Sequence, residues 1–196
     1  MRLAAIQSAA AASIASRRGG RLPRLARNPC AAWRRASAAA PKLACAIALV
    51  LTAAPASAVS NKVRITKLSD VAFGTLANLS VDAVSSESVC VYANTTTSGY
   101  NVTASGTGPG GAFQLSSGSR SMAYAVQWSS SAGQSSGVQL TPNVPLTGQI
   151  SSATQQTCGN GPATSASLIV VLRTAALSSA TAGAYSGTLT LLVGPE

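Results

Sequence analysis

The chain has 196 residues and a formal net charge of +10, yet nearly all of that charge lies in its first 42 residues. Residues 1–42 hold nine basic side chains and no acid, whereas residues 59–196 hold five basic and four acidic side chains. The basic total is therefore no reason to expect nucleic-acid binding. The chain contains no His, which excludes a Ser-His-Asp triad and removes the commonest general base and metal ligand.

The N-terminal part has the three regions of a secretory signal peptide. A basic segment is followed by the apolar run Leu43–Leu51 and then by an A-x-A cleavage site at Ala56 and Ala58. The apolar run favours a signal peptide over a membrane anchor, because a spanning helix needs about 20 residues. We expect residues 1–58 to be removed, so that residues 59–196 are exported through the inner membrane to the periplasm and retain no transmembrane segment.

Residues 59–196 fit one domain, and their apolar side chains alternate at a period of two, which is typical of strands. The segment Leu168–Leu172 is apolar on both faces, which favours a central strand, and Ala175–Ala182 suggests one short helical turn. The sequence therefore predicts an all-β, immunoglobulin-like sandwich of about seven strands. The clearest strands are expected around Val63–Ile65, Val89–Val91, Tyr100–Ala104, Met122–Trp128, Leu168–Leu172 and Tyr185–Val193.

Segments rich in Gly, Pro and Ser separate these strands and predict turns. They are Gly106–Gly111, Ser129–Gly137 and the long connection Pro142–Gly161. The first of them lacks the Lys of a phosphate-binding loop and does not lead into a helical pattern, so it is interpreted as a turn.

Two cysteines, Cys90 and Cys158, lie in the part that we expect to be exported. In an oxidising compartment two cysteines in a small domain are expected to pair, and the disulfide would join a strand to the end of the long connection. A metal site is the less favoured alternative, because structural zinc needs four N or S ligands. We expect no metal and no cofactor.

Catalytic chemistry finds little support in the sequence. The carboxylates of Asp82 and Glu87 are the best pair for an enzyme that works through acids alone, but both lie in a polar stretch before a strand and are interpreted as solvated surface groups. The stripe Met122, Tyr124, Val126 and Trp128 is interpreted as core, with a ligand-binding face as the alternative. We therefore expect a protein that is not an enzyme.

Two segments resemble a known family. Asp70–Leu76 is similar to the early strand of spore coat protein U domains, the pilin-like subunits of archaic, Csu-type chaperone–usher systems. Ala182–Val193 resembles the last strand of these pilins, with its G-x-Y-x-x-x-L-x-L pattern. The resemblance implies an immunoglobulin fold that lacks its last strand and so has an open edge and an exposed groove. A periplasmic chaperone fills the groove first, and the N-terminal strand of the next subunit then replaces it.

By this resemblance the chain would be a structural subunit of a fimbria, with a role in cell adhesion and biofilm formation. Its partners would be a periplasmic chaperone, an outer-membrane usher and neighbouring pilin subunits at the cell surface. The strand that borders the groove would contain Gly183, Tyr185, Leu189, Leu191 and Val193, and the carboxylate of Glu196 would meet basic residues of the chaperone.

The start of the mature chain leaves two interpretations open. Val59, Val63 and Ile65 could anchor a donor strand that is given to a neighbouring subunit, or this stretch could be the first strand of the domain itself. In the second case the protein accepts a strand but gives none. A secreted binding module or tip adhesin with a complete sandwich is the alternative function.

Overall fold

The computed structural model describes residues 2–3, 7–10 and 61–196. In these residues the fold is an all-β sandwich with one short α-helix, as the alternating pattern predicts. None of the described helices has the length and hydropathy of a membrane span. The elements in chain order are β1 (Arg2–Leu3), β2 (Gln7–Ala10), β3 (Lys62–Thr66), β4 (Val71–Ala72), β5 (Ala83–Asn94), β6 (Gly99–Gly106), a 3₁₀ turn (Pro109–Gly111), β7 (Gln114–Ser117), β8 (Arg120–Ala123), β9 (Ala125–Ser129), β10 (Val138–Gln139), β11 (Leu146–Ile150), β12 (Ala166–Leu172), α1 (Thr174–Ser179), β13 (Ser186–Gly187) and β14 (Leu189–Pro195).

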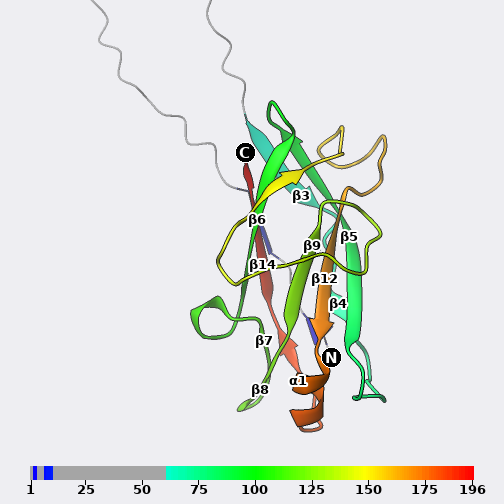
Figure 1. Cartoon of the computed structure of the whole chain (residues 1–196), viewed down its shortest axis with the longest axis vertical. Coiled ribbons are helices and arrows are strands. Elements are labelled where there is room, and N and C mark those ends of the chain that lie inside the picture. Colours follow the sequence, from blue (N-terminus) through cyan, green and yellow to red (C-terminus); the bar gives the residue numbers. More distant parts are fainter. Residues whose placement is uncertain (1, 4–6, 11–60) are drawn as a thin grey trace, which may run out of the picture. The chain divides into compact units, whose positions relative to one another are not determined.

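The strands form three hydrogen-bonded sheets, which we name by one strand each. The β12 sheet has the order β10-β9-β12-β5-β3, the β14 sheet the order β11-β6-β14-β2, and the β13 sheet the order β4-β1-β13-β7-β8. Figure 1 shows β6 and β14 side by side, with β9, β12 and β5 in the neighbouring layer. All seven residues of β12 are buried, which confirms that the doubly apolar segment is a central strand.

One continuous core lies between the β12 and β14 sheets. Leu189, Leu191 and Val193 of β14 belong to the same buried cluster as Leu168 of β12 and Trp128 of β9. Along β9 and β14 these side chains alternate with polar or more exposed ones, so each of the two strands places its apolar face inward, whereas β12 is buried on both faces. The period-two pattern is thus the sequence feature that forms the sandwich.

The centre of this core contains one polar contact. The indole Nε1–H of Trp128 donates a hydrogen bond to the hydroxyl oxygen of Tyr100 at 3.1 Å, and the two rings meet edge to face with their centroids 6.5 Å apart. Both side chains are fully buried, and burial raises the pKa of Tyr100 to about 12, so the hydroxyl stays protonated at neutral pH.

We expect the substitution Tyr100→Phe to lower the free energy of unfolding by about 1–3 kcal/mol, because it leaves the buried indole N–H without an acceptor. Urea denaturation followed by tryptophan fluorescence measures the change. Tyr92→Phe is the matched control, since Tyr92 is only partly buried. Equal midpoints for Tyr100→Phe and the wild type would contradict the role assigned to this hydrogen bond.

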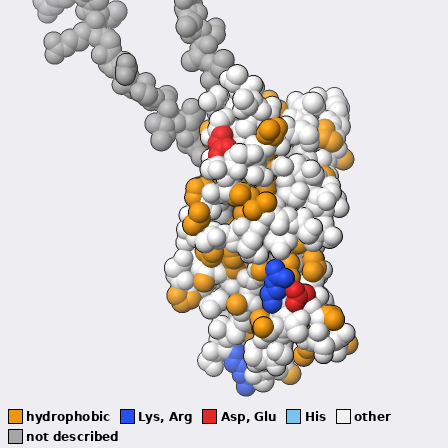
Figure 2. All heavy atoms as spheres, in the orientation of Figure 1, with side chains coloured by type: hydrophobic (Ala, Val, Ile, Leu, Met, Phe, Trp, Pro, Cys, Tyr) orange, Lys and Arg blue, Asp and Glu red, His pale blue; other side chains and the backbone are white. Residues whose placement is uncertain are grey.

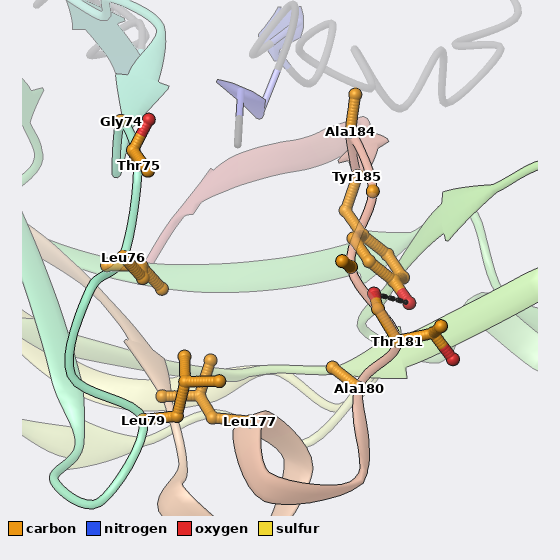
Figure 3. A pocket seen from close by; sticks show the side chains of 11 residues that line it. Gly74, Thr75, Leu76, Leu79, Leu177, Ala180, Thr181, Ala184 and Tyr185 are labelled. Atoms are coloured by element: carbon orange, nitrogen blue, oxygen red, sulfur yellow. Dashed lines mark hydrogen bonds between the residues drawn. The ribbon is translucent and has the colours of Figure 1, made fainter.

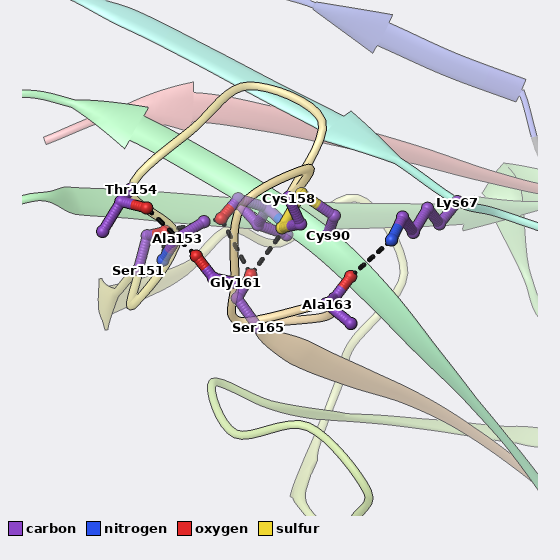
Figure 4. The surroundings of a disulfide bond; sticks show 10 residues. Lys67, Cys90, Ser151, Ala153, Thr154, Cys158, Gly161, Ala163 and Ser165 are labelled. Carbon is purple, nitrogen blue, oxygen red and sulfur yellow. Dashed lines mark hydrogen bonds between the residues drawn. A yellow bond between two sulfur atoms is a disulfide. The ribbon is translucent and has the colours of Figure 1, made fainter.

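The disulfide predicted from the sequence is present. Cys90 in β5 and Cys158 in the connection after β11 are bonded, with their Cα atoms 6.0 Å apart, and both are buried beside Ala153 (Figure 4). Ser165 Oγ donates to the carbonyl of Val91 at 2.8 Å, and Ser151 Oγ donates to the same carbonyl. Both ends of the connection between β11 and β12 are therefore joined to β5 near the disulfide.

The stripe Met122–Trp128 is core, as predicted, but it is not one strand. Met122 lies in β8 of the β13 sheet, whereas Val126 and Trp128 lie in β9 of the β12 sheet. The chain changes sheet at Tyr124, whose N–H donates to the carbonyl of Phe113 at 3.0 Å and whose ring packs on that of Phe113. Because all four side chains of the stripe are buried, the alternative of an exposed binding face is wrong.

Two segment boundaries also differ from the prediction. The long connection Pro142–Gly161 is not entirely turn, because it contains the edge strand β11, which pairs with β6. In addition, β5 begins at Ala83, so Glu87 lies within a strand rather than before it. Both segments are rich in polar residues, and their pairing to an established strand outweighs their weak intrinsic preference for strand.

The described surface carries few charged side chains. On the face in Figure 2 blue and red atoms are sparse, and small orange areas are scattered among uncharged polar atoms. The most exposed large apolar side chain, Ile150, is 62% exposed and lies at the end of the edge strand β11.

Candidate functional site

The candidate site is the edge of β13 and β14 that no other strand of residues 61–196 covers. Leu189, Leu191 and Val193 point into the core and are fully buried, whereas Leu192 between them is 40% exposed. On one side β14 pairs with β6 in an antiparallel ladder that runs from Leu189 opposite Gly106 to Pro195 opposite Tyr100. Among residues 61–196 no strand pairs with the other side of β14.

That other side is paired instead by strands from the N-terminal end of the chain. β2 lies parallel to β14, with Gln7 opposite Thr190 and Ala10 opposite Val193. β1 lies parallel to β13 and antiparallel to β4, so it occupies the gap between those two strands. β3 of the opposite sheet contacts both β2 and β14. The domain formed by residues 61–196 therefore leaves a strand-sized gap along this edge.

A cavity of about 430 Å³ lies at the end of the gap, next to the residues that precede β13. β1 pairs with Ser186 and Gly187, and the cavity is lined by the chain immediately before them. Figure 3 shows Leu76, Leu79, Leu177 and Tyr185 around it, so its walls are mainly apolar. The full lining is Gly74, Thr75, Leu76, Leu79, Leu177, Ala180, Thr181, Ala182, Gly183, Ala184 and Tyr185.

Three segments build the walls of this cavity. The loop after β4 provides Leu76 and Leu79, α1 provides the fully buried Leu177, and the segment before β13 provides Tyr185. The hydroxyl of Tyr185 donates to the carbonyl of Thr181 at 3.0 Å, which fixes the ring against its own segment (Figure 3).

Hydrogen bonds to one carboxylate join the start of α1 to the start of β5. The N–H of Thr174 donates to Asp82 Oδ1 at 2.7 Å, and its hydroxyl donates to the same oxygen at 2.9 Å. Arg173 Nη1 donates to Asp82 Oδ2 at 2.9 Å. The Thr174 N–H above all, with the Arg173 side chain next, holds the pKa of Asp82 below its usual range.

The residues predicted for the groove fall into three places. Gly183 and Tyr185 line the cavity, and a Cβ at Gly183 would lie 3.0 Å from Ser117 Oγ. Leu189, Leu191 and Val193 lie beneath the edge, as described above. Glu196 follows β14; its N–H donates to the carbonyl of Gly99 at 3.2 Å, and its carboxylate accepts the Gly148 N–H at 2.7 Å.

The residues predicted for a donor strand have a different place. Val63 and Ile65 lie in β3, which pairs with β5, and both are buried in the core of their own domain. In this structure the stretch is therefore a strand of its own domain. Val59 and the cleavage residues Ala56 and Ala58 lie outside the described residues.

The two acids considered for catalysis have separate partners. Asp82 is bonded to Arg173 and Thr174, whereas Glu87 Oε2 accepts the hydroxyl of Ser69 at 2.5 Å. In the described part of the chain, no three His, Cys, Asp or Glu side chains gather to form a potential metal site.

The sequence contains no pattern that predicts the cavity. Leu79 and Leu177 are 98 positions apart in the chain and neither lies in a regular pattern, so only the fold brings them together. A large apolar residue, Leu177, within a helical turn of small residues is a signal in the sequence that favours a buried anchor there.

Comparison with known proteins gives one distant likeness. No family model and no curated protein matches the chain. A solved chain from a chaperone–tip adhesin complex of CFA/I fimbriae is 16% identical, with a TM-score of 0.44. The similarity covers 69% of this chain and 41% of the other, so this protein spans less than half of that chain's length. A similarity this distant assigns neither family nor function.

Proposed function

We propose that residues 59–196 form a structural, pilin-like subunit of a surface fibre, which is assembled by a periplasmic chaperone and an outer-membrane usher through exchange of donor strands. The subunit has no catalytic site. Its function is to accept a strand from a partner along β13 and β14, and this strand links the subunit to its neighbour in the fibre. This is the function that the spore coat protein U resemblance implies for the chain.

The observation that carries the proposal is the edge that residues 61–196 leave without a partner strand of their own. Within residues 61–196 β14 has a partner on one side only, and β4 has none, although β14 is a long and otherwise regular strand. Such an edge presents a row of free N–H and C=O groups to which another strand can add. Added strands gain main-chain hydrogen bonds and place alternate side chains in pockets, and the mainly apolar lining of the cavity before β13 suits apolar side chains.

The N-terminal strands fit the proposal as temporary occupants. β1 and β2 belong to the leader that we propose is removed after Ala58, and their loss would leave the edge bare in the exported chain. A chaperone would then supply the missing strand in the periplasm, and a neighbouring subunit would supply it in the fibre.

The position of β3 bears on the place of this subunit in a fibre. Because Val63 and Ile65 are buried in their own domain, the subunit would accept a strand without giving these residues to another. This favours a subunit at the end of the fibre or a minor subunit over one that repeats along the shaft.

Recovery of the tagged protein from the periplasm of its natural host tests the proposal. We expect the mature chain to be recovered in a one-to-one complex with a periplasmic chaperone, because its edge needs a strand. The matched control carries a copy of Ser60–Lys67 after Glu196, joined by a flexible linker, and we expect it to be recovered alone as a monomer. A wild-type chain that is also recovered alone as a stable monomer would contradict the proposal.

The closed binding module remains as the second candidate, since in the full chain β1 and β2 do occupy the edge. This candidate requires that the N-terminal strands stay attached to the exported protein. The N-terminal sequence of the purified surface protein decides between the two: a start at Val59 favours the fibre subunit, and a start before Arg2 or at Arg2 favours the closed module.

A further inference from the structure

The cavity before β13 has two walls that come from distant parts of the chain. One wall is the loop between β4 and β5, which includes Thr75 and Leu79. The other consists of α1 and the segment that follows it, including Leu177 and Thr181. In Figure 3 Thr75 and Thr181 lie on opposite sides of the cavity. Its width therefore depends on what holds these two segments together.

The ladder between β5 and β12 stops short of the cavity, whereas at the other end of the two walls β1 pairs with both β4 and β13. The ladder between β5 and β12 ends with Ala83 opposite Leu172, and from there the two chains diverge into the two walls. Asp82 is the residue immediately before this last pair, and Arg173 and Thr174 are the residues immediately after it. The three hydrogen bonds of Asp82 thus link the two segments one residue beyond the last pair of the β5–β12 ladder.

The same carboxylate also completes α1. The residue that precedes the helix, Arg173, makes no side-chain capping hydrogen bond, and the Thr174 N–H at the first helical position is satisfied by Asp82 from the other segment. Helix N-termini leave such N–H groups without an intrahelical partner, so an acceptor from another segment fixes where the helix begins. Leu177 lies one turn later and enters the cavity wall.

We infer that Asp82 is a positioning residue, which fixes the separation of the two cavity walls at the end away from β1 by joining the start of β5 to the start of α1. The consequence for function rests on the proposed function: the wall separation would select the size of the donor side chain that the cavity accepts. The expected contribution to global stability is small, because both partners of the ion pair are at least one-third exposed.

A distance measurement across the cavity tests this inference in the full-length chain. Thr75 and Thr181 are exposed residues on opposite walls, and each is replaced by an unnatural amino acid with a ketone group. A nitroxide label is attached to the ketone. Because this labelling needs no added cysteine, the disulfide is left intact. Pulsed electron resonance gives the distribution of distances between the two labels. We expect Asp82→Ala to broaden this distribution and shift it to longer distances, while thermal unfolding of the same sample changes by only a few degrees.

Glu87→Ala is the matched control, because it also removes a carboxylate that accepts a hydrogen bond, from Ser69, and it should leave the distribution unchanged. If Asp82→Ala does not fold, Asp82→Asn and Arg173→Gln replace it, and each should broaden the distribution less. An unchanged distribution in the variants that fold would overturn the inference. Since no donor strand is used, a failure of the fibre proposal leaves this result unaffected, and the reverse also holds.

Discussion

A copy of Ser60–Lys67 joined to the C-terminus of residues 59–196 by a flexible linker is expected to raise the melting temperature by about 10–20 °C. The appended strand can fold back antiparallel to β14 and pair with the edge that residues 61–196 leave free. Its two alternate apolar side chains, copies of Val63 and Ile65, would each contribute about 1.5–3 kcal/mol on burial. Differential scanning calorimetry of the purified domain measures the shift.

The control for this experiment is the same extended chain with the copied Val63 and Ile65 replaced by Ser. It keeps the linker and the main chain of the appended strand but loses the apolar anchors, so most of the rise should disappear. Equal melting temperatures for the plain, extended and Ser-substituted domains, with all three monomeric, would indicate that no gap exists to be filled and would favour the closed module.

Removal of the disulfide is the second change with a large expected effect. The double substitution of Cys90 and Cys158 by Ala should lower the free energy of unfolding by about 4 kcal/mol in the chain-entropy account, because the bond closes a loop with a sequence separation of 68 residues. Both cysteines are buried, and Ala introduces no polar group at these positions, so the loss reflects mainly the missing covalent bond. Guanidinium denaturation of the oxidised wild type and of the double variant measures the difference.

Reduction of the wild type provides the control for this prediction. A reductant should move the wild-type unfolding midpoint toward that of the double variant and leave the variant itself unchanged. A double variant that unfolds at the wild-type midpoint would contradict the role assigned to the bond, since the connection after β11 would then be held by Ser151 and Ser165 alone.

The spacing of apolar residues was sufficient to predict the central strands, because a strand buried on one face has apolar residues at every second position and a strand buried on both faces is apolar throughout. The apolar segment at 168–172 became β12, and Leu189, Leu191 and Val193 became the inner face of β14. The disulfide followed from compartment and cysteine number. These features depend on the residue types themselves and not on where the chain later turns.

The sequence pattern did not predict features that depend on contact with a segment distant in the chain. Nothing in the period of Met122–Trp128 indicates that the chain changes sheet at Tyr124, because the alternation continues through the break. β11 and the first half of β5 are polar strands whose formation depends on pairing with a neighbour. Asp82 is a surface acid, as predicted, but its bonds to Arg173 and Thr174 could not be predicted because these residues are 91 and 92 positions away in the chain.

The small number of charged side chains on the described surface determines how the stability of the protein responds to salt and pH. Residues 59–196 hold five basic and four acidic side chains and no His, so their side-chain charge is +1 (five minus four). No side-chain type present there ordinarily titrates between about pH 5 and 8. Added salt has little charge to screen. The stability of the fold thus depends mainly on apolar packing, hydrogen bonds and one disulfide. We therefore expect it to change little with ionic strength or between neutral and mildly acidic pH.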